Sequence, residues 1–162
     1  MDTAKIVPKL EEIYPEPSLY LDSTTNDEAD KLVQGILMSF VRGLIPEIKV
    51  LLQEPSKSYY VESRERRSGM TMSEMTKEFG GERGWQKADP FLQMLKALFE
   101  SNKRDNGPFI LGSKPSFGDF IIVALFESFK KLAQGVYDRL LEYDTSFQDL
   151  NEACRPWTER DD

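Results

Sequence analysis

Residues 116–126 read SFGDFIIVALF, in which a possible helix start is followed by seven apolar residues. Ser116 and Asp119 stand three positions apart, the spacing of a capping box, in which a hydroxyl and an acidic side chain satisfy each other's backbone amides. A helix that is apolar on every face must be surrounded by protein, and seven residues cannot span a bilayer, which needs about 20. The sequence therefore predicts a central buried helix from Ser116 to about Leu132, with Ser116 and Asp119 as its structural cap.

The composition narrows the classes of function. The chain has 162 residues, no histidine, one cysteine and a formal net charge of -7. That length suits one domain with a real core, and the acidic balance argues against nucleic-acid and polybasic membrane partners. Without histidine, His-based triads and most zinc sites are excluded. A single cysteine cannot form an internal disulfide, and no apolar leader follows Met1. We therefore expect a soluble cytoplasmic protein that binds no metal, nucleic acid or membrane.

Apolar residues at steps of three and four predict the other helices. The predicted helices cover residues 3–13, 25–53, 85–99, 136–141 and 147–157. Thr25 and Glu28 have the spacing of a second capping box at the start of the longest helix, and Pro46 is expected to kink it. Pro15 and Pro17 mark a linker after the first helix. The pattern predicts an all-α protein of five or six helices around a buried one.

The middle of the chain, residues 54–84, is polar and charged. Thr71 and Glu74 predict a third capping box. Met72, Met75 and Phe79 share one helix face, which is more typical of a soft core than of a cofactor site. Arg64, Arg66 and Arg67 are flanked by Glu62 and Glu65, so a solvated, self-paired face is favoured over an anion site.

Residues 109–120, FILGSKPSFGDF, resemble the loop and capped helix of the glutathione S-transferase C-terminal domain. A small residue such as Ala usually precedes the Asp in that family, and Gly118 departs from the pattern at some cost in helix stability. Tyr59-Tyr60 and the segments 63–65, 69–71 and 153–157 are similar to a narrower group, the fungal-specific class A and etherase-like transferases. The likeness covers essentially the whole chain. It implies an all-α glutathione S-transferase C-terminal-like bundle around the capped helix, in residues 23–162.

The first residues carry a further resemblance. Asp2 and Thr3, followed by Ile6 and Leu10, are similar to the acidic-hydroxyl pair and the helix that end the family's thioredoxin-like domain. In the family that pair binds the γ-glutamyl carboxylate of glutathione at a helix N-terminus, which stabilises anions. Residues 1–22 are therefore expected to be the last helix of such a domain and a linker, with Asp2 and Thr3 as glutathione-binding candidates.

The resemblance also implies which parts of such an enzyme this sequence lacks. The family's βαβ unit, its catalytic Ser, Tyr or Cys and its cis-Pro have no counterpart in the 162 residues. No catalytic residue is therefore predicted, and the thioredoxin-like domain is expected to be missing. Cys154 lies on an apolar stripe with Leu150 and Trp157, with no base to activate it, and is expected to be a small core residue.

Four aromatic residues are candidates for binding an apolar substrate: Tyr59, Tyr60, Phe117 and Phe40. Tyr59 and Tyr60 follow the longest helix, where covering a substrate and simple packing are equally favoured. Phe40 and Phe117 are expected in the core first and at a pocket second, because large aromatic side chains are mostly buried. In the family the substrate wall belongs to the helical half, so we expect Tyr59, Tyr60 and Phe117 to lie near one cleft.

Three hypotheses about function stay open. The first is a glutathione-dependent transferase or aryl-ether-cleaving enzyme that acts on a small apolar or aromatic electrophile once a thioredoxin-like domain is supplied, with glutathione as co-substrate. The second is a non-catalytic module that binds apolar aromatic ligands or a protein partner. The third is an inactive truncated product. Without a thioredoxin-like domain an apolar surface is expected to stay open, which favours a homodimer or such a domain as partner.

Overall fold

The computed structural model describes residues 3–159, and within that range every regular element is a helix, apart from one antiparallel bridge between Phe109 and Gly112. The elements in chain order are α1 (Thr3–Ile13), α2 (Thr24–Ile48), the 3-10 turn η1 (Lys49–Leu51), α3 (Ser56–Ser68), α4 (Met72–Phe79), α5 (Glu82–Asn102), α6 (Phe117–Leu132), α7 (Gln134–Tyr143), α8 (Thr145–Ala153) and α9 (Arg155–Thr158). The predicted all-α class is confirmed, with shorter and more numerous helices than the apolar spacing indicated.

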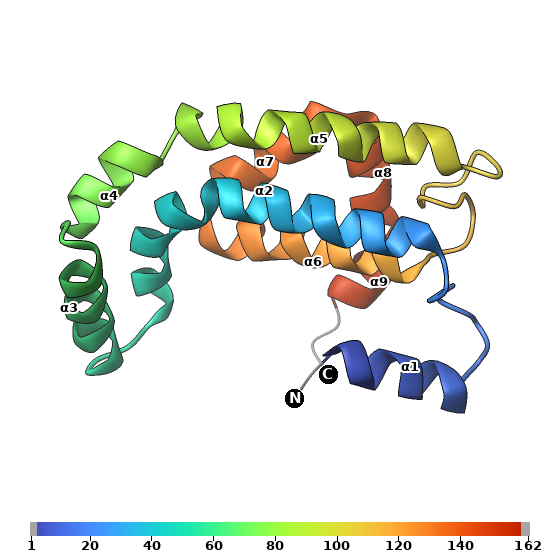
Figure 1. Ribbon diagram of the computed structural model, residues 1–162, viewed down its shortest axis with the longest axis horizontal. Coiled ribbons are helices and arrows are strands. Elements are labelled where there is room, and N and C mark those ends of the chain that lie inside the picture. The colour runs from blue at the N-terminus through green and yellow to red at the C-terminus, as the bar shows by residue number, and fades with distance from the viewer. Residues whose placement is uncertain (1–2, 160–162) are drawn as a thin grey trace.

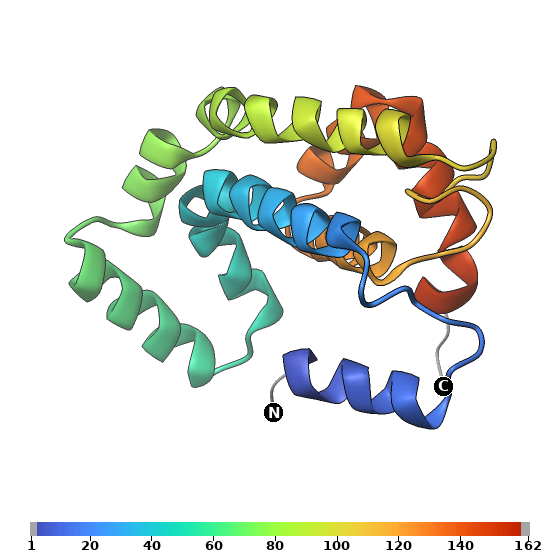
Figure 2. The ribbon, with the colours of Figure 1, turned by 45° about the vertical axis from the view of Figure 1, so that its right-hand side comes forward.

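The helices α2, α5 and α6 form the body of the molecule and run side by side along its long axis (Figure 1). Both α5 and α6 pack on α2, while α7 and α8 close the bundle behind them. Figure 2 shows that α1 lies apart from this bundle, below α2 and α6, and that α3 projects from its other end. The molecule is therefore a helical bundle with two outlying helices.

The inner face of α6 is the centre of the core. Ile122, Phe126 and Phe129 are fully buried, and Phe129 meets Phe40 of α2 edge-to-face with ring centroids 5.4 Å apart. Phe40 makes a second edge-to-face contact, at 5.1 Å, with Trp85 of α5. Aromatic pairs in this geometry are stabilised beyond the area they bury. The predicted central helix is thereby confirmed.

The opposite face of α6 is less covered than the sequence indicated. Phe117, Phe120 and Ile121 are only half-buried, and Ala124 is exposed. These positions follow one another at steps of three and one, so they form a single stripe along the helix. The prediction that protein surrounds α6 on every side is therefore wrong for this stripe, which faces α1.

Two of the three predicted capping boxes are present. Ser116 with Asp119 caps α6, and Thr71 with Glu74 caps α4. The prediction for Thr25 and Glu28 is wrong, because α2 begins one residue earlier and Ser23 is its N-cap residue. The Thr25 hydroxyl instead lies 2.7 Å from the Ser23 hydroxyl.

Two further segments differ from the apolar pattern. α3 is a helix of 13 residues with no buried residue, so no apolar period marked it in the sequence. The single last helix expected over 147–157 is divided at Cys154 into α8 and α9, and Pro156 lies in the first turn of α9. Pro46 lies inside α2 as predicted. None of the described helices is both long enough and apolar enough to cross a membrane.

Candidate functional site

The start of α6 is anchored to the segment that joins α1 to α2. The Phe117 N–H donates to the Leu19 carbonyl at 2.9 Å, and the Gly118 N–H donates to the side-chain oxygen of Asn26 at 2.8 Å. The amide nitrogen of Asn26 in turn donates to the Tyr20 carbonyl at 2.7 Å. The position of Phe117 is therefore set by hydrogen bonds from two other parts of the chain.

The buried carboxylate of Asp119 fixes the loop before α6. Its Oδ2 accepts from the Ser116 N–H at 2.7 Å and from the Ser116 hydroxyl at 2.6 Å. Its Oδ1 accepts from the Ile110 N–H at 2.8 Å. Burial raises the pKa of Asp119, and these three donors act in the opposite direction by stabilising the charged form. All three donors belong to the loop before α6 or to the capping residue itself. The contacts therefore support the predicted role of Ser116 and Asp119 as a helix cap.

Gly118 is packed too closely for a larger residue to enter without adjustment. A Cβ there would lie 3.1 Å from Asn26 Oδ1 and 3.2 Å from the Ala29 Cβ. Glycine destabilises the helix at this position relative to alanine. This cost is offset because the missing side chain allows α2 and α6 to pack closely.

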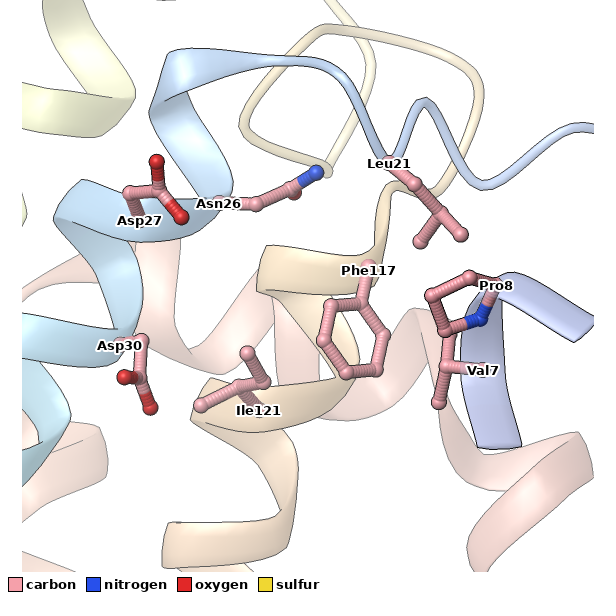
Figure 3. A pocket seen from close by; sticks show the side chains of 8 residues that line it. All are labelled: Val7, Pro8, Leu21, Asn26, Asp27, Asp30, Phe117 and Ile121. Atoms are coloured by element: carbon pink, nitrogen blue, oxygen red, sulfur yellow. The ribbon is translucent and has the colours of Figure 1, made fainter. Parts of the chain in front are cut away.

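A pocket of about 390 Å³ opens beside Phe117. Figure 3 shows Phe117 of α6 facing Val7 and Pro8 of α1, with Leu21 of the linker above them and Ile121 of α6 on the side of Asp30. Both elements contribute apolar side chains, and the volume lies within the range of small-molecule sites. The pocket can therefore hold an apolar group of modest size.

The polar side of this pocket is provided by the first turns of α2. Asn26, Asp27 and Asp30 line it, and no Lys or Arg is among its described lining residues. Asp30 also accepts from Gln34 at 2.7 Å. The negative charge near the opening disfavours anionic ligands relative to neutral or cationic ones.

A second pocket of about 400 Å³ adjoins the first and is also lined by residues of α1 and α6. It is formed mainly by apolar side chains, among them Leu10, Tyr14 and Phe120. Val7 and Phe117 line both pockets. The two apolar spaces thus adjoin at Val7 of α1 and Phe117 of α6.

The other three aromatic candidates lie elsewhere. Phe40 is 5% exposed and belongs to the core. Tyr59 on α3 is 76% exposed, while the Tyr60 hydroxyl donates to the Ile45 carbonyl at 3.0 Å and its ring lies 5.0 Å from the Arg64 guanidinium. No described pocket is lined by both Phe117 and either tyrosine. Of the four candidates only Phe117 lines the pocket beside α1, and the substrate-binding role of Tyr59, Tyr60 and Phe40 stays a prediction.

The sequence pattern did not indicate several residues of that pocket. The sequence places Ile121 in an all-round apolar run, and nothing in the order of the chain brings Val7 or Leu21 to α6. The stripe formed by Phe117, Ile121 and Ala124 at helical spacing is the one signal that could have identified this face.

The two glutathione-binding candidates fall at the edge of the structure. Asp2 lies outside the described residues, and the side chain of Thr3, the first residue of α1, is likewise outside them. Their role stays a prediction. Within residues 3–159, no three His, Cys, Asp or Glu side chains come together as a metal site.

Cys154 is fully buried at the junction of α8 and α9. Burial raises the pKa of its thiol to about 12, and the negative charge of Asp119 adds to the effect. Only the thiolate is a nucleophile, so the chemistry of this side chain matches the predicted core role.

Comparison with known proteins agrees with this architecture. The glutathione S-transferase-like protein ustS of Aspergillus flavus is 28% identical over 170 residues, which cover 98% of this chain and 61% of that protein. The solved glutathione transferase GSTFuA2 from Phanerochaete chrysosporium superposes with a TM-score of 0.71 at 23% identity, over 99% of this chain and 66% of its own. For GSTFuA3 of the same fungus the TM-score is 0.62 at 21% identity, over 90% and 64% of the two chains.

These structural likenesses show the fold. The chain spans roughly two thirds or less of the length of each of these relatives. Residues 29–157, most of the chain, match the family model described as glutathione S-transferase, C-terminal domain. The chain is therefore a member of the glutathione S-transferase C-terminal domain family.

Proposed function

We propose that this chain is the helical, substrate-binding part of a glutathione-dependent transferase. In this proposal the apolar part of an electrophile lies in the pocket between α1 and α6, against Phe117. The observation that supports it is the half-buried apolar stripe of α6, which faces α1 across a space of about 390 Å³ in a member of this family. An aryl ether is one electrophile that fits an aromatic wall of this kind.

The reaction itself requires groups that the described residues do not supply. Conjugation depends on stabilising a thiolate with a donor aimed at its sulfur, and on holding both reactants for attack. The chain has no histidine, and its cysteine is buried with a raised pKa. We therefore assign to this chain the exclusion of water and the positioning of the electrophile, and to a thioredoxin-like domain the activation of glutathione.

Glutathione is placed by the same proposal at the start of α1. Asp2 and Thr3 precede and begin a helix of 11 residues, and a helix N-terminus stabilises a carboxylate. The resemblance to the family's acidic-hydroxyl pair supports this assignment. The cytoplasmic location expected from the lone cysteine stays a prediction.

The test compares the chain alone with a fusion that places a fungal thioredoxin-like domain before Asp2. Both are assayed with glutathione and a chromogenic aryl electrophile. We expect turnover above the uncatalysed rate in the fusion and none in the chain alone. Turnover by the chain alone would contradict the division of roles.

Two variants of the fusion locate the substrate. Phe117→Ala removes the aromatic wall, and we expect KM for the electrophile to rise while KM for glutathione stays unchanged. Tyr59→Ala is the matched control, because this side chain is exposed on α3. Equal effects of the two substitutions, or a change in KM for glutathione alone, would remove the pocket beside Phe117 from the proposal. Circular dichroism checks that both variants are folded.

A further inference from the structure

Helix α1 is held against the rest of the chain with little help from burial. Among the described residues it packs closely on no other helix, and Figure 2 shows it apart from α2 and α6. Leu10, Ile13 and Tyr14, on or just after α1, are 51%, 55% and 70% exposed. Yet α1 forms one wall of the pocket beside Phe117 (Figure 3). The position of this wall must therefore depend on other contacts.

A carboxylate on α1 makes such contacts. Glu11 is half-buried, and its Oε1 accepts from the Ser18 hydroxyl at 2.6 Å and from the Leu19 N–H at 2.9 Å. Its Oε2 lies 3.2 Å from the same backbone nitrogen. Hydrogen bonds to an ionised carboxylate are about twice as strong as those between neutral groups. Glu11 thus ties the linker back onto the helix that precedes it.

Leu19 extends this connection to α6. Its N–H donates to Glu11, while its carbonyl accepts from the Phe117 N–H at 2.9 Å. The Ser18 hydroxyl, which is the other partner of Glu11, also accepts from the Tyr20 N–H at 3.1 Å. The backbone of a single linker residue therefore joins α1 to the first turn of α6, and Glu11 holds the α1 end of that connection.

The same face of α1 carries the pocket wall. Val7 and Glu11 are four residues apart, so their side chains lie one above the other on the helix. Val7 lines the pocket beside Phe117 and the pocket that adjoins it, and Glu11 lines the second of these. A shift of α1 after loss of the Glu11 contacts therefore moves Val7 relative to Phe117.

The next residue offers a contrast. Glu12 is exposed and pairs with Lys9 of the same helix at 2.7 Å. An exposed ion pair of this kind contributes little to stability. The pair of Glu12 also stays within α1, whereas Glu11 reaches the linker. Two adjacent carboxylates thus differ in whether they connect α1 to the rest of the chain.

From these contacts we propose that Glu11 is a positioning residue. It holds α1 at the start of α6 and thereby sets the width of the pocket between Val7 and Phe117. That width determines how large an aromatic group must be to touch both walls. This role rests on the proposed function for the identity of the ligand, the aryl part of an electrophile, and adds the residue that selects the size of that part.

The first test uses the chain alone and two unreactive ligands that differ by one ring, benzyl alcohol and 1-naphthalenemethanol. Binding is followed through the Phe117 N–H signal in a ¹H–¹⁵N spectrum. In Glu11→Ala we expect benzyl alcohol to lose more affinity than 1-naphthalenemethanol, because the smaller ring no longer reaches both walls. The ratio of the two dissociation constants should change by about tenfold, at the low end of what one missing methylene contact costs.

Two further variants separate this role from a general loss of stability, which would weaken both ligands alike. Glu12→Ala removes a carboxylate from the next position and should leave the ratio unchanged. Glu11→Gln keeps one acceptor oxygen for the Leu19 N–H and should restore most of the parental ratio. Amide exchange at Phe117, whose acceptor is the Leu19 carbonyl, should become faster in Glu11→Ala and stay unchanged in Glu12→Ala. Circular dichroism checks that each variant is folded.

The second test repeats the comparison in the fusion with a thioredoxin-like domain, with benzyl chloride and 1-(chloromethyl)naphthalene as electrophiles. In both reactions the glutathione thiol gives its proton to solvent, its sulfur bonds to the CH₂ carbon, and chloride leaves. Glu11→Ala should lower kcat/KM for benzyl chloride by about tenfold relative to that for the naphthyl compound. Glu12→Ala should leave the two values in their parental ratio.

The outcomes separate the role of Glu11 from the proposed function. A ratio of dissociation constants that Glu11→Ala leaves unchanged, or that Glu12→Ala changes equally, overturns the role of Glu11 whether or not the fusion is active. Parental amide exchange at Phe117 in Glu11→Ala does the same. An inactive fusion together with a changed ratio in the chain alone supports Glu11 and overturns the transferase proposal. If neither alcohol shifts the Phe117 signal up to its solubility limit, both proposals fail.

Discussion

The side-chain oxygen of Asn26, in the first turn of α2, accepts a hydrogen bond of 2.8 Å from the Gly118 N–H in the first turn of α6. The two residues are 92 positions apart in the chain. Asn26 is 5% exposed and also donates to the Tyr20 carbonyl. One side chain therefore joins the starts of two helices and the linker between α1 and α2.

Asn26→Ala leaves the Gly118 N–H without its partner. We expect the free energy of unfolding to fall by about 1–3 kcal/mol, the cost of leaving a buried polar group unsatisfied. Gln34→Ala removes an exposed side chain from the same helix and serves as the control. Urea denaturation of both variants provides the comparison, and equal midpoints would contradict the role given to Asn26.

Ser116→Ala removes a hydroxyl that donates to the buried Asp119 carboxylate. A loss of about 0.5–2 kcal/mol is expected, as for other N-cap residues. Thr71→Ala deletes the corresponding hydroxyl from the exposed cap of α4, where water replaces the lost bond, so its effect should be smaller. Thermal melts compare the loss of stability in the two variants. A larger loss for Thr71→Ala than for Ser116→Ala would contradict the prediction that the buried cap stabilises the protein more.

Cys154 should be inert in the folded chain. Its side chain is fully buried and burial raises its pKa to about 12, so a chromogenic aryl disulfide at pH 8 should react only after denaturant is added. Reaction of the native chain at the rate of a free thiol would show that the junction of α8 and α9 opens.

The Cys154 thiol also makes the free energy of unfolding depend on pH. Its folded pKa is raised from the ordinary 9.0 to about 12, so the unfolded chain loses this proton at lower pH than the folded chain does. The protonated thiol therefore contributes fully to the free energy of unfolding below pH 9.0, and this contribution is lost as the pH rises toward 12. Unfolding of Cys154→Ala should accordingly depend less steeply on pH over that interval than unfolding of the parent chain.

Three apolar side chains on α2 are open to solvent. Met38 is 71% exposed, and Leu37 and Val41 beside it are 38% and 36% exposed. We expect the chain to self-associate through this surface, and Met38→Glu to reduce the association seen by light scattering. Met94→Glu on α5, also more than half exposed, is the matched control. A parent chain that stays monomeric at every concentration would contradict this expectation.

The sequence predicted those features of the fold that depend on neighbouring residues. The cap formed by Ser116 and Asp119 was predicted because its spacing is local and the apolar run begins at once. The start of α2 was placed wrongly because Ser23, Thr24 and Thr25 are adjacent and each can cap a helix. The observed start of α2 places Asn26 where it accepts a hydrogen bond from Gly118 of α6. No local spacing in the sequence reveals this contact.

The candidate site was predicted less well than the fold. The sequence indicates Phe117 as a candidate, and it does line a pocket. Its opposing residues Val7 and Pro8 come from a helix whose position depends on how the linker folds back. Tyr59 and Tyr60 were grouped with Phe117 because the path of α3 was unknown. Since α3 buries no residue, its sequence carries no pattern that fixes its direction.

The backbone amides at the start of α6 have a consequence for charged ligands. A free helix N-terminus attracts anions through its unpaired N–H groups. Here the Phe117 N–H is bound to Leu19, the Gly118 N–H to Asn26 and the Asp119 N–H to the Ser116 carbonyl at 3.2 Å. The positive end of this helix is thus closed by the chain itself, and a carboxylate that approaches Phe117 must find its donors on another element.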